Sequence, residues 1–146
     1  MDAKKFLQQA GCIEQRIDAL LMESYRLRSL AERATQAFRG EASSRSGVSH
    51  RIENAVLQLD LLEEQVITEI TELVRVKREI QTVIQRVGNP VEKELLILHY
   101  IGGKPFEEIA EQMNYSWRHI RRLHQKALGS VEQARKPSAP TGDKCA

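Results

Sequence analysis

Two long runs of apolar residues, spaced alternately three and four apart, constrain this chain most. Such spacing puts one apolar stripe along a helix that packs lengthwise against another helix. The first run stops at Arg39 and Gly40 and the second at Gly88, and the polar stretch from Glu41 to Ser49 between them predicts a loop. The first run is Phe6, Ala10, Ile13, Ile17, Leu20, Ser24, Leu27, Ala31, Ala34 and Phe38; the second is Ile52, Val56, Leu59, Leu62, Val66, Ile70, Leu73, Val76, Ile80, Val83 or Ile84, and Val87.

Two helices of near-equal length joined by a loop indicate a long antiparallel hairpin, coiled-coil-like, over residues 1–88. The second stripe is as wide as Leu59, Leu61 and Leu62, so two helices alone would leave apolar surface uncovered. Pairing with a second copy is the simplest way to cover it. We therefore expect a homo-oligomer, with a dimer favoured. Taken alone, this half of the chain also fits a purely structural rod.

A different pattern follows Gly88. Asn89 is placed to cap a helix, Pro90 suits its first turn, and Glu92 is placed to complete a capping box. Gly102 and Gly103 are expected to end that helix. Its predicted buried face consists of Leu95, Leu96, Leu98, Tyr100 and Ile101.

Two further short helices are predicted after the glycines. Pro105 opens the first, and it ends at Asn114, a residue that tolerates the left-handed conformation of a tight turn. Ser116 caps the last helix, which runs from Trp117 to about Leu128. Their predicted inward positions are Phe106, Ile109, Ala110 and Met113, then Ile120, Leu123, Ala127 and Leu128. The fold class expected is all-α, a hairpin followed by a three-helix helix-turn-helix domain over residues 89–134.

The charge distribution points to the partner of this domain. The whole chain has 22 basic and 20 acidic residues, but the segment from Tyr115 to Ser130 has four cations and no acid. A helix in the major groove of DNA meets phosphates at its sides and base edges beneath it, and arginine suits both. We therefore expect double-stranded DNA as the partner. The candidate DNA-binding residues are Ser116, Trp117, Arg118, Arg121, Arg122, Gln125 and Lys126.

Several short motifs in this part of the chain resemble region 4 of sigma-70-type transcription factors, over roughly residues 90–130. They are Glu107-Glu108-Ile109-Ala110, Asn114-Tyr115-Ser116, Ile120-Arg121-Arg122-Leu123 and Lys126-Ala127-Leu128. The resemblance implies that the outer face of the last helix contacts a promoter −35 element and that RNA polymerase is a possible partner. The sequence departs from region 4 at Asn114, where glycine is usual, and at Trp117, where a polar or basic residue is common. With its hairpin, the whole chain resembles prophage late-gene regulators of the ArpU and RinA type.

Other classes of function lack support in the residues. No nucleophile, phosphate-cradling glycine loop or paired-acid site is evident, so neither an enzyme nor a cofactor is expected. His99, His119 and His124 have no partners at metal-ligand spacing, so no metal site is expected. The two cysteines are far apart and no apolar run is long enough to span a membrane, which fits the cytoplasm. The tail over residues 135–146 has the composition of a disordered end.

Three functions therefore remain after this reading. The first is a phage or prophage transcription regulator that acts as an accessory activator at promoters. The second is a packaging protein of the phage small-terminase type, although such proteins usually place the DNA-binding part first. The third is a coiled-coil adaptor that binds RNA polymerase through its C-terminal domain.

Overall fold

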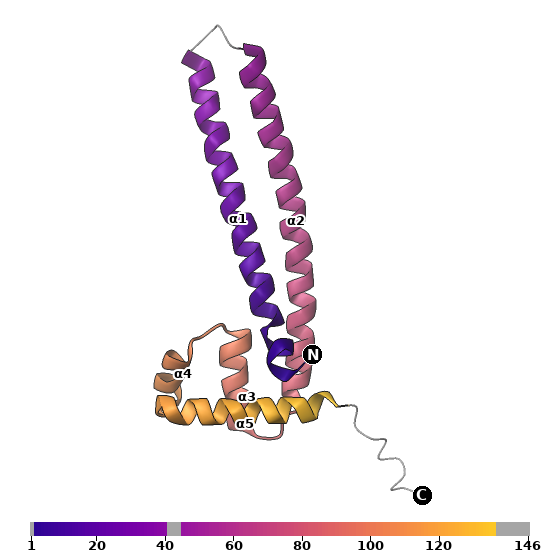
Figure 1. Ribbon diagram of the computed structural model, residues 1–146, viewed down its shortest axis with the longest axis vertical. Coiled ribbons are helices and arrows are strands. Elements are labelled where there is room, and N and C mark those ends of the chain that lie inside the picture. The colour runs from indigo at the N-terminus through magenta and orange to yellow at the C-terminus, as the bar shows by residue number, and fades with distance from the viewer. Residues whose placement is uncertain (1, 41–44, 137–146) are drawn as a thin grey trace, which may run out of the picture. The chain divides into compact units, whose positions relative to one another are not determined.

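The computed structural model describes residues 2–40 and 45–136, which are all-α and contain no strand (Figure 1). None of the helices in these ranges is long and apolar enough to cross a membrane. In chain order the elements are α1 (Ala3–Gly40), α2 (Arg45–Gln85), α3 (Pro90–Leu96), a π-helical turn (Ile97–Ile101), α4 (Phe106–Met113) and α5 (Trp117–Arg135).

The loop expected over residues 41–49 is wrong in its second half, because α2 already begins at Arg45. Residues 41–44 lie outside the described residues. The expectation rested on composition, but a serine or glycine costs a helix at most about 1 kcal/mol. The second helix ends at Gln85, two residues before the Val87 of the predicted stripe.

The chain divides into two compact units, each described here by itself. The first, called the hairpin unit below, is Ile13–Leu73. The second, called the terminal unit, combines Met1–Cys12 with Val74–Ala146.

In the hairpin unit, α1 and α2 run antiparallel and side by side (Figure 1). Arg16 pairs with Glu69 at 3.2 Å and Arg28 with Glu63 at 3.7 Å, so partner numbers fall as α1 advances. These pairs are largely exposed, and such pairs contribute at most about 1 kcal/mol each. Burial of the apolar seam therefore contributes most of the free energy that holds α1 against α2. Its most buried members are Ile13, Ile17, Ser24 and Val66, while Leu20, Leu27, Leu59 and Leu62 are half-buried.

Two members of the predicted second stripe do not face the other helix. Val56 is 47% exposed and Ile70 44% exposed, whereas the neighbouring Ala55 and Glu69 are half-buried. Glu69 lies at an inter-helix position, where it pairs with Arg16, and the next residue, Ile70, points outward. A straight α-helix also drifts by about 20° per heptad from a strict seven-residue repeat, so a seam read at fixed spacing loses register.

The terminal unit holds the helix-turn-helix. The core cluster of the helix-turn-helix consists of Leu95, Ile109, Ala110, Ile120 and Leu123, against which Val91, Leu98, Phe106 and Met113 pack. These side chains come from α3, the π-helical turn, α4 and α5, as the apolar spacing predicted. The end of α3 differs from the prediction, because the last turn before Gly102 is π-helical.

The start of α1 belongs to the same unit and packs against the end of α5. The amide of Ala3 donates to the Glu132 carboxylate at 2.8 Å, and the Arg135 guanidinium lies 4.6 Å from the centre of the Phe6 ring. The predicted end of α5 near Leu128 is therefore too early. The helix continues to Arg135, and Val131 in its added turns is fully buried. Residues 137–146 of the expected tail lie outside the described residues.

Candidate nucleic-acid interface

The entry into the domain follows the predicted cap, with one difference. The Asn89 side chain accepts from the amides of Val91 and Glu92 at 2.9 and 3.3 Å. The buried Glu92 carboxylate, instead of completing a capping box, accepts from the Ser130 hydroxyl at 2.7 Å. This bond ties the first turn of α3 to α5.

The turn between α4 and α5 is fixed by two residues that the sequence identified. Asn114 ends α4 in the left-handed conformation, with φ 59° and ψ 40°. Two residues later the Ser116 hydroxyl accepts from the amide of His119 at 3.1 Å and caps α5. This short connection between α4 and α5, packed on α3, is the geometry of a helix-turn-helix, with α5 in the position of the recognition helix.

The conformation of Asn114 yields a first prediction. Asn114→Gly should leave the free energy of unfolding within a few tenths of a kcal/mol of wild type or raise it slightly, because glycine adopts positive φ freely. Asn114→Ala should lower it by about 1 kcal/mol, because a Cβ is strained there. Glu111→Ala, an exposed position inside α4, is the control and should change little. Equal unfolding midpoints in urea for the glycine and alanine variants would contradict the assignment.

The outer face of α5 gathers every candidate DNA-binding side chain. Trp117, Arg118, Arg121, Arg122, Gln125 and Lys126 are all exposed, as is the cap residue Ser116. At about 100° per residue the six helical positions spread over about half of the helix circumference. The opposite half carries the buried Ile120, Leu123, His124, Ala127 and Val131. Within the described chain, none of the four cations on this face forms an ion pair, so their charge is available to a partner.

Trp117, half-exposed at the start of α5, has a clear neighbour. The Arg121 guanidinium lies 4.9 Å from the centre of the Trp117 ring, one turn further along the helix. Such cation–π contacts are worth about 0.5–1 kcal/mol at exposed sites. The contact restrains the arginine without neutralising it, so Trp117 acts on this face partly by orienting Arg121.

A cluster of rings behind α5 was not identified from the sequence. The Tyr100 hydroxyl and His124 Nε2 are 2.6 Å apart, and His99 stacks on Phe106 with ring centres 4.2 Å apart. His99 Nδ1 also lies 2.8 Å from the carbonyl oxygen of Lys104. His124 is only 7% exposed. No group of three or more histidine, cysteine or acidic side chains lies together within the described ranges in a way that could hold a metal.

Burial changes the ionisation of two members of this cluster. It lowers the pKa of His124 to about 4, and the nearby charges of His99 and Lys4 act in the same direction. Burial also raises the pKa of Tyr100 to about 12. At neutral pH both groups are therefore uncharged. Their spacing of 24 residues gave no local signal, because only the fold brings the two side chains together.

The segment from α3 to α5 thus has the geometry of a helix-turn-helix domain. Residues 89–132 match the family model for sigma-70, region 4, a DNA-binding helix-turn-helix domain. The match agrees with the resemblance drawn from the sequence motifs, and this part of the chain is a sigma-70 region 4-like domain. Neither the curated proteins nor the solved structures include a match to the chain.

Proposed function

We propose that this protein is a sequence-specific double-stranded DNA-binding transcription regulator of the ArpU and RinA type. We further propose that it is encoded by a phage or prophage and acts as an accessory activator at promoters. The observation that carries the proposal is the outer face of α5, where four exposed cations have no ion-pair partner in the described chain. This face lies in a region 4-like domain, which supports the proposal that the protein acts at promoters. RNA polymerase is a second partner consistent with that likeness.

The side chains of this face are proposed to divide between bases and phosphates. Arg121 and Gln125 lie one turn apart near the middle of the face, and we assign them mainly to base edges. The contact with Trp117 supports this for Arg121, because base reading needs an oriented guanidinium. Arg122 and Lys126, further round the helix, are assigned mainly to phosphates. Arg118 suits either role.

The division predicts different results for two alanine variants. Arg121→Ala should lower affinity for the preferred duplex by about 1–3 kcal/mol and change binding to random DNA little, because base contacts discriminate between sequences. Arg122→Ala should weaken binding to both duplexes and reduce the slope of log affinity against log salt by about one unit. Titration of wild type and both variants on the two duplexes at several salt concentrations measures this.

The same titrations separate the proposal from the adaptor function. If neither variant changes binding to any duplex while association with RNA polymerase is lost, α5 is a protein-binding surface. The regulator proposal then fails in its DNA-binding part. A parallel loss on both duplexes for Arg121→Ala would contradict only the division into base and phosphate contacts.

We also propose that the hairpin unit pairs with a second copy of the chain. Nine large apolar side chains in it are 44–74% exposed: Leu21, Met22, Tyr25, Leu30, Val56, Leu57, Leu61, Ile67 and Ile70. Leu21 and Tyr25 are one turn apart on α1, and Ile67 and Ile70 one turn apart on α2, so each helix carries an outward apolar stripe. Exposed apolar stripes of this kind typically mark an interaction site.

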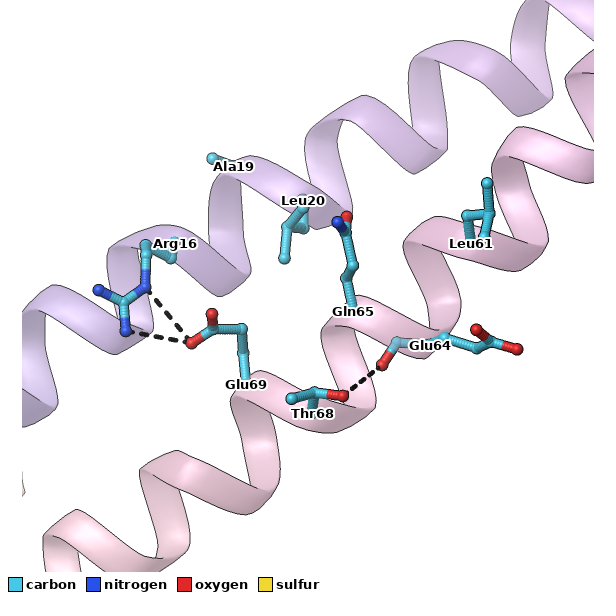
Figure 2. A pocket seen from close by; sticks show the side chains of 8 residues that line it. All are labelled: Arg16, Ala19, Leu20, Leu61, Glu64, Gln65, Thr68 and Glu69. Atoms are coloured by element: carbon cyan, nitrogen blue, oxygen red, sulfur yellow. Dashed lines mark hydrogen bonds and ion pairs between the residues drawn. The ribbon is translucent and has the colours of Figure 1, made fainter.

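A groove between the two helices supports the same proposal. Figure 2 shows this groove, with a volume of about 650 Å³, where Leu20 of α1 and Leu61 and Gln65 of α2 lie on its walls. The Arg16–Glu69 pair bridges the two helices at one end of the group of side chains drawn. Two helices thus leave apolar surface unfilled along their length, as the width of the sequence stripe predicted. A second hairpin, completing a four-helix bundle, has the matching apolar surface.

A further inference from the structure

The start of α1 adds a polar edge to the terminal unit, close to the recognition helix. Ala3, Leu7 and Ala10 are 4%, 0% and 1% exposed and pack inward. The backbone bond from Ala3 to Glu132 and the contact between Phe6 and Arg135 hold this segment against α5. The side chains on its exposed face are therefore fixed relative to α5.

Lys4 and Gln8 lie one turn apart on that exposed face, as Arg121 and Gln125 do on α5. The four side chains line one polar cavity of about 290 Å³, and Tyr100 and His124 also line it. None of the residues that line the cavity is acidic. Two cations and two amides around an acid-free cavity suit an anion.

The charge of Lys4 reaches the inner part of this cavity. Burial is the main cause that lowers the pKa of His124, and Lys4 acts in the same direction, so its ammonium is near enough to influence that ring. Arg121 is also one of the side chains assigned to DNA. An anion in the cavity would thus lie beside the DNA-binding face of α5.

We propose that Lys4, with Gln8, binds a backbone phosphate of the DNA that α5 occupies, so that the N-terminal segment extends the DNA-binding surface. This rests on the proposed function, because it assumes that α5 binds DNA. A phosphate contact by Lys4 adds affinity without sequence preference, whereas Arg121 on the other wall of the cavity reads bases. The N-terminal segment then fixes the position of the domain on the duplex.

The test uses the full chain and three variants, Lys4→Gln, Lys4→Arg and Lys5→Gln. Lys5 is the matched control, because it is an exposed lysine next in sequence that does not line the cavity. Each protein is titrated with the preferred duplex and a random duplex at several salt concentrations. Lys4→Gln should weaken binding to both duplexes by a similar factor, about three- to tenfold, and reduce the salt slope by about one unit. Lys4→Arg and Lys5→Gln should keep the wild-type slope.

The possible failures are distinguishable. If wild type binds DNA and Lys4→Gln has the wild-type salt slope, this inference fails while the proposed function stands. If wild type binds no duplex, both fail. Calorimetric titration with inorganic phosphate, in the absence of DNA, is a further measurement. If phosphate binding requires Lys4 while Lys4→Gln leaves the salt slope of DNA binding unchanged, the cavity is a site for a free anion. That result would overturn the proposed DNA contact.

Discussion

Replacing Ile67 by lysine is expected to raise the dissociation constant of the homo-oligomer by roughly a hundredfold or more. Ile67 is 65% exposed in the single chain, so the hairpin itself tolerates a charge there. In the proposed bundle the same position is buried, and a buried unpaired charge costs several kcal/mol. Each 1.4 kcal/mol or so is a factor of ten in the dissociation constant. Sedimentation velocity over the micromolar range measures the change.

Thr68→Lys is the companion to this substitution, because it places the same charge on the groove instead of on the outward apolar stripe. Thr68 is the next residue and is also exposed, but it lies about 100° further round α2, on the wall of the groove. Both lysines have a glutamate four residues earlier, Glu63 or Glu64, so the helix gains the same favourable pair in either variant. Dissociation by Thr68→Lys with none by Ile67→Lys would place the interface over the groove and contradict the assignment of the Ile67 stripe. A wild-type chain that stays a folded monomer at micromolar concentration would refute the oligomer. Leu59 and Leu62 are less suitable test positions, because both are half-buried within the hairpin.

Acid should destabilise the terminal unit through His124. The folded pKa of this ring is about 4, against an ordinary value of 6.5. Above pH 6.5 the ring is neutral in both states and its contribution to stability is complete. Between pH 6.5 and pH 4 only the unfolded chain takes up the proton, so stability falls as the pH is lowered, by up to about 3 kcal/mol in total.

The contribution of His124 is isolated by comparison with His124→Gln. Glutamine keeps an acceptor for the Tyr100 hydroxyl and does not titrate, so carboxylates and the other histidines contribute equally to both proteins. The difference in free energy of unfolding between wild type and variant, measured in urea from pH 7.5 to pH 4, should change steadily below pH 6.5. A pH-independent difference would show that His124 does not resist protonation in the folded protein.

The parts of the fold that sequence predicted best depend on neighbouring residues. Asn89 and Ser116 accept hydrogen bonds from amides in the first turn of the helix that follows, and Asn114 adopts the left-handed conformation that ends α4. Each role depends only on adjacent residues, so the local sequence pattern is enough to predict it. The inward faces of α4 and α5 followed in the same way from helical spacing. The exposed face of α5 was predicted with them, because the outer positions are what remain once the core is assigned.

The features that sequence missed depend on contacts between distant segments. Ala3 and Glu132 are 129 positions apart, and no local pattern indicated that the start of α1 would pack against α5 or that α5 would continue to Arg135. Lys4 therefore gave no signal as a neighbour of the outer face of α5. In the hairpin, Ile70 was predicted inward on fixed spacing, but a straight helix drifts from that spacing and Glu69 takes the inter-helix position instead.

Selection of bound duplexes from a random DNA pool, with the full wild-type chain, tests DNA recognition by α5 most directly. The selected sequences should converge on one motif, and wild type should bind that motif more tightly than random DNA by about a thousandfold or more at physiological salt. Arg121→Ala, selected in parallel, should lose preference at one or two positions of the motif and keep the rest. A folded wild-type chain that enriches no sequence, or whose enriched motif is unchanged when α5 carries Arg121→Ala with Gln125→Ala, would contradict sequence-specific recognition by this helix.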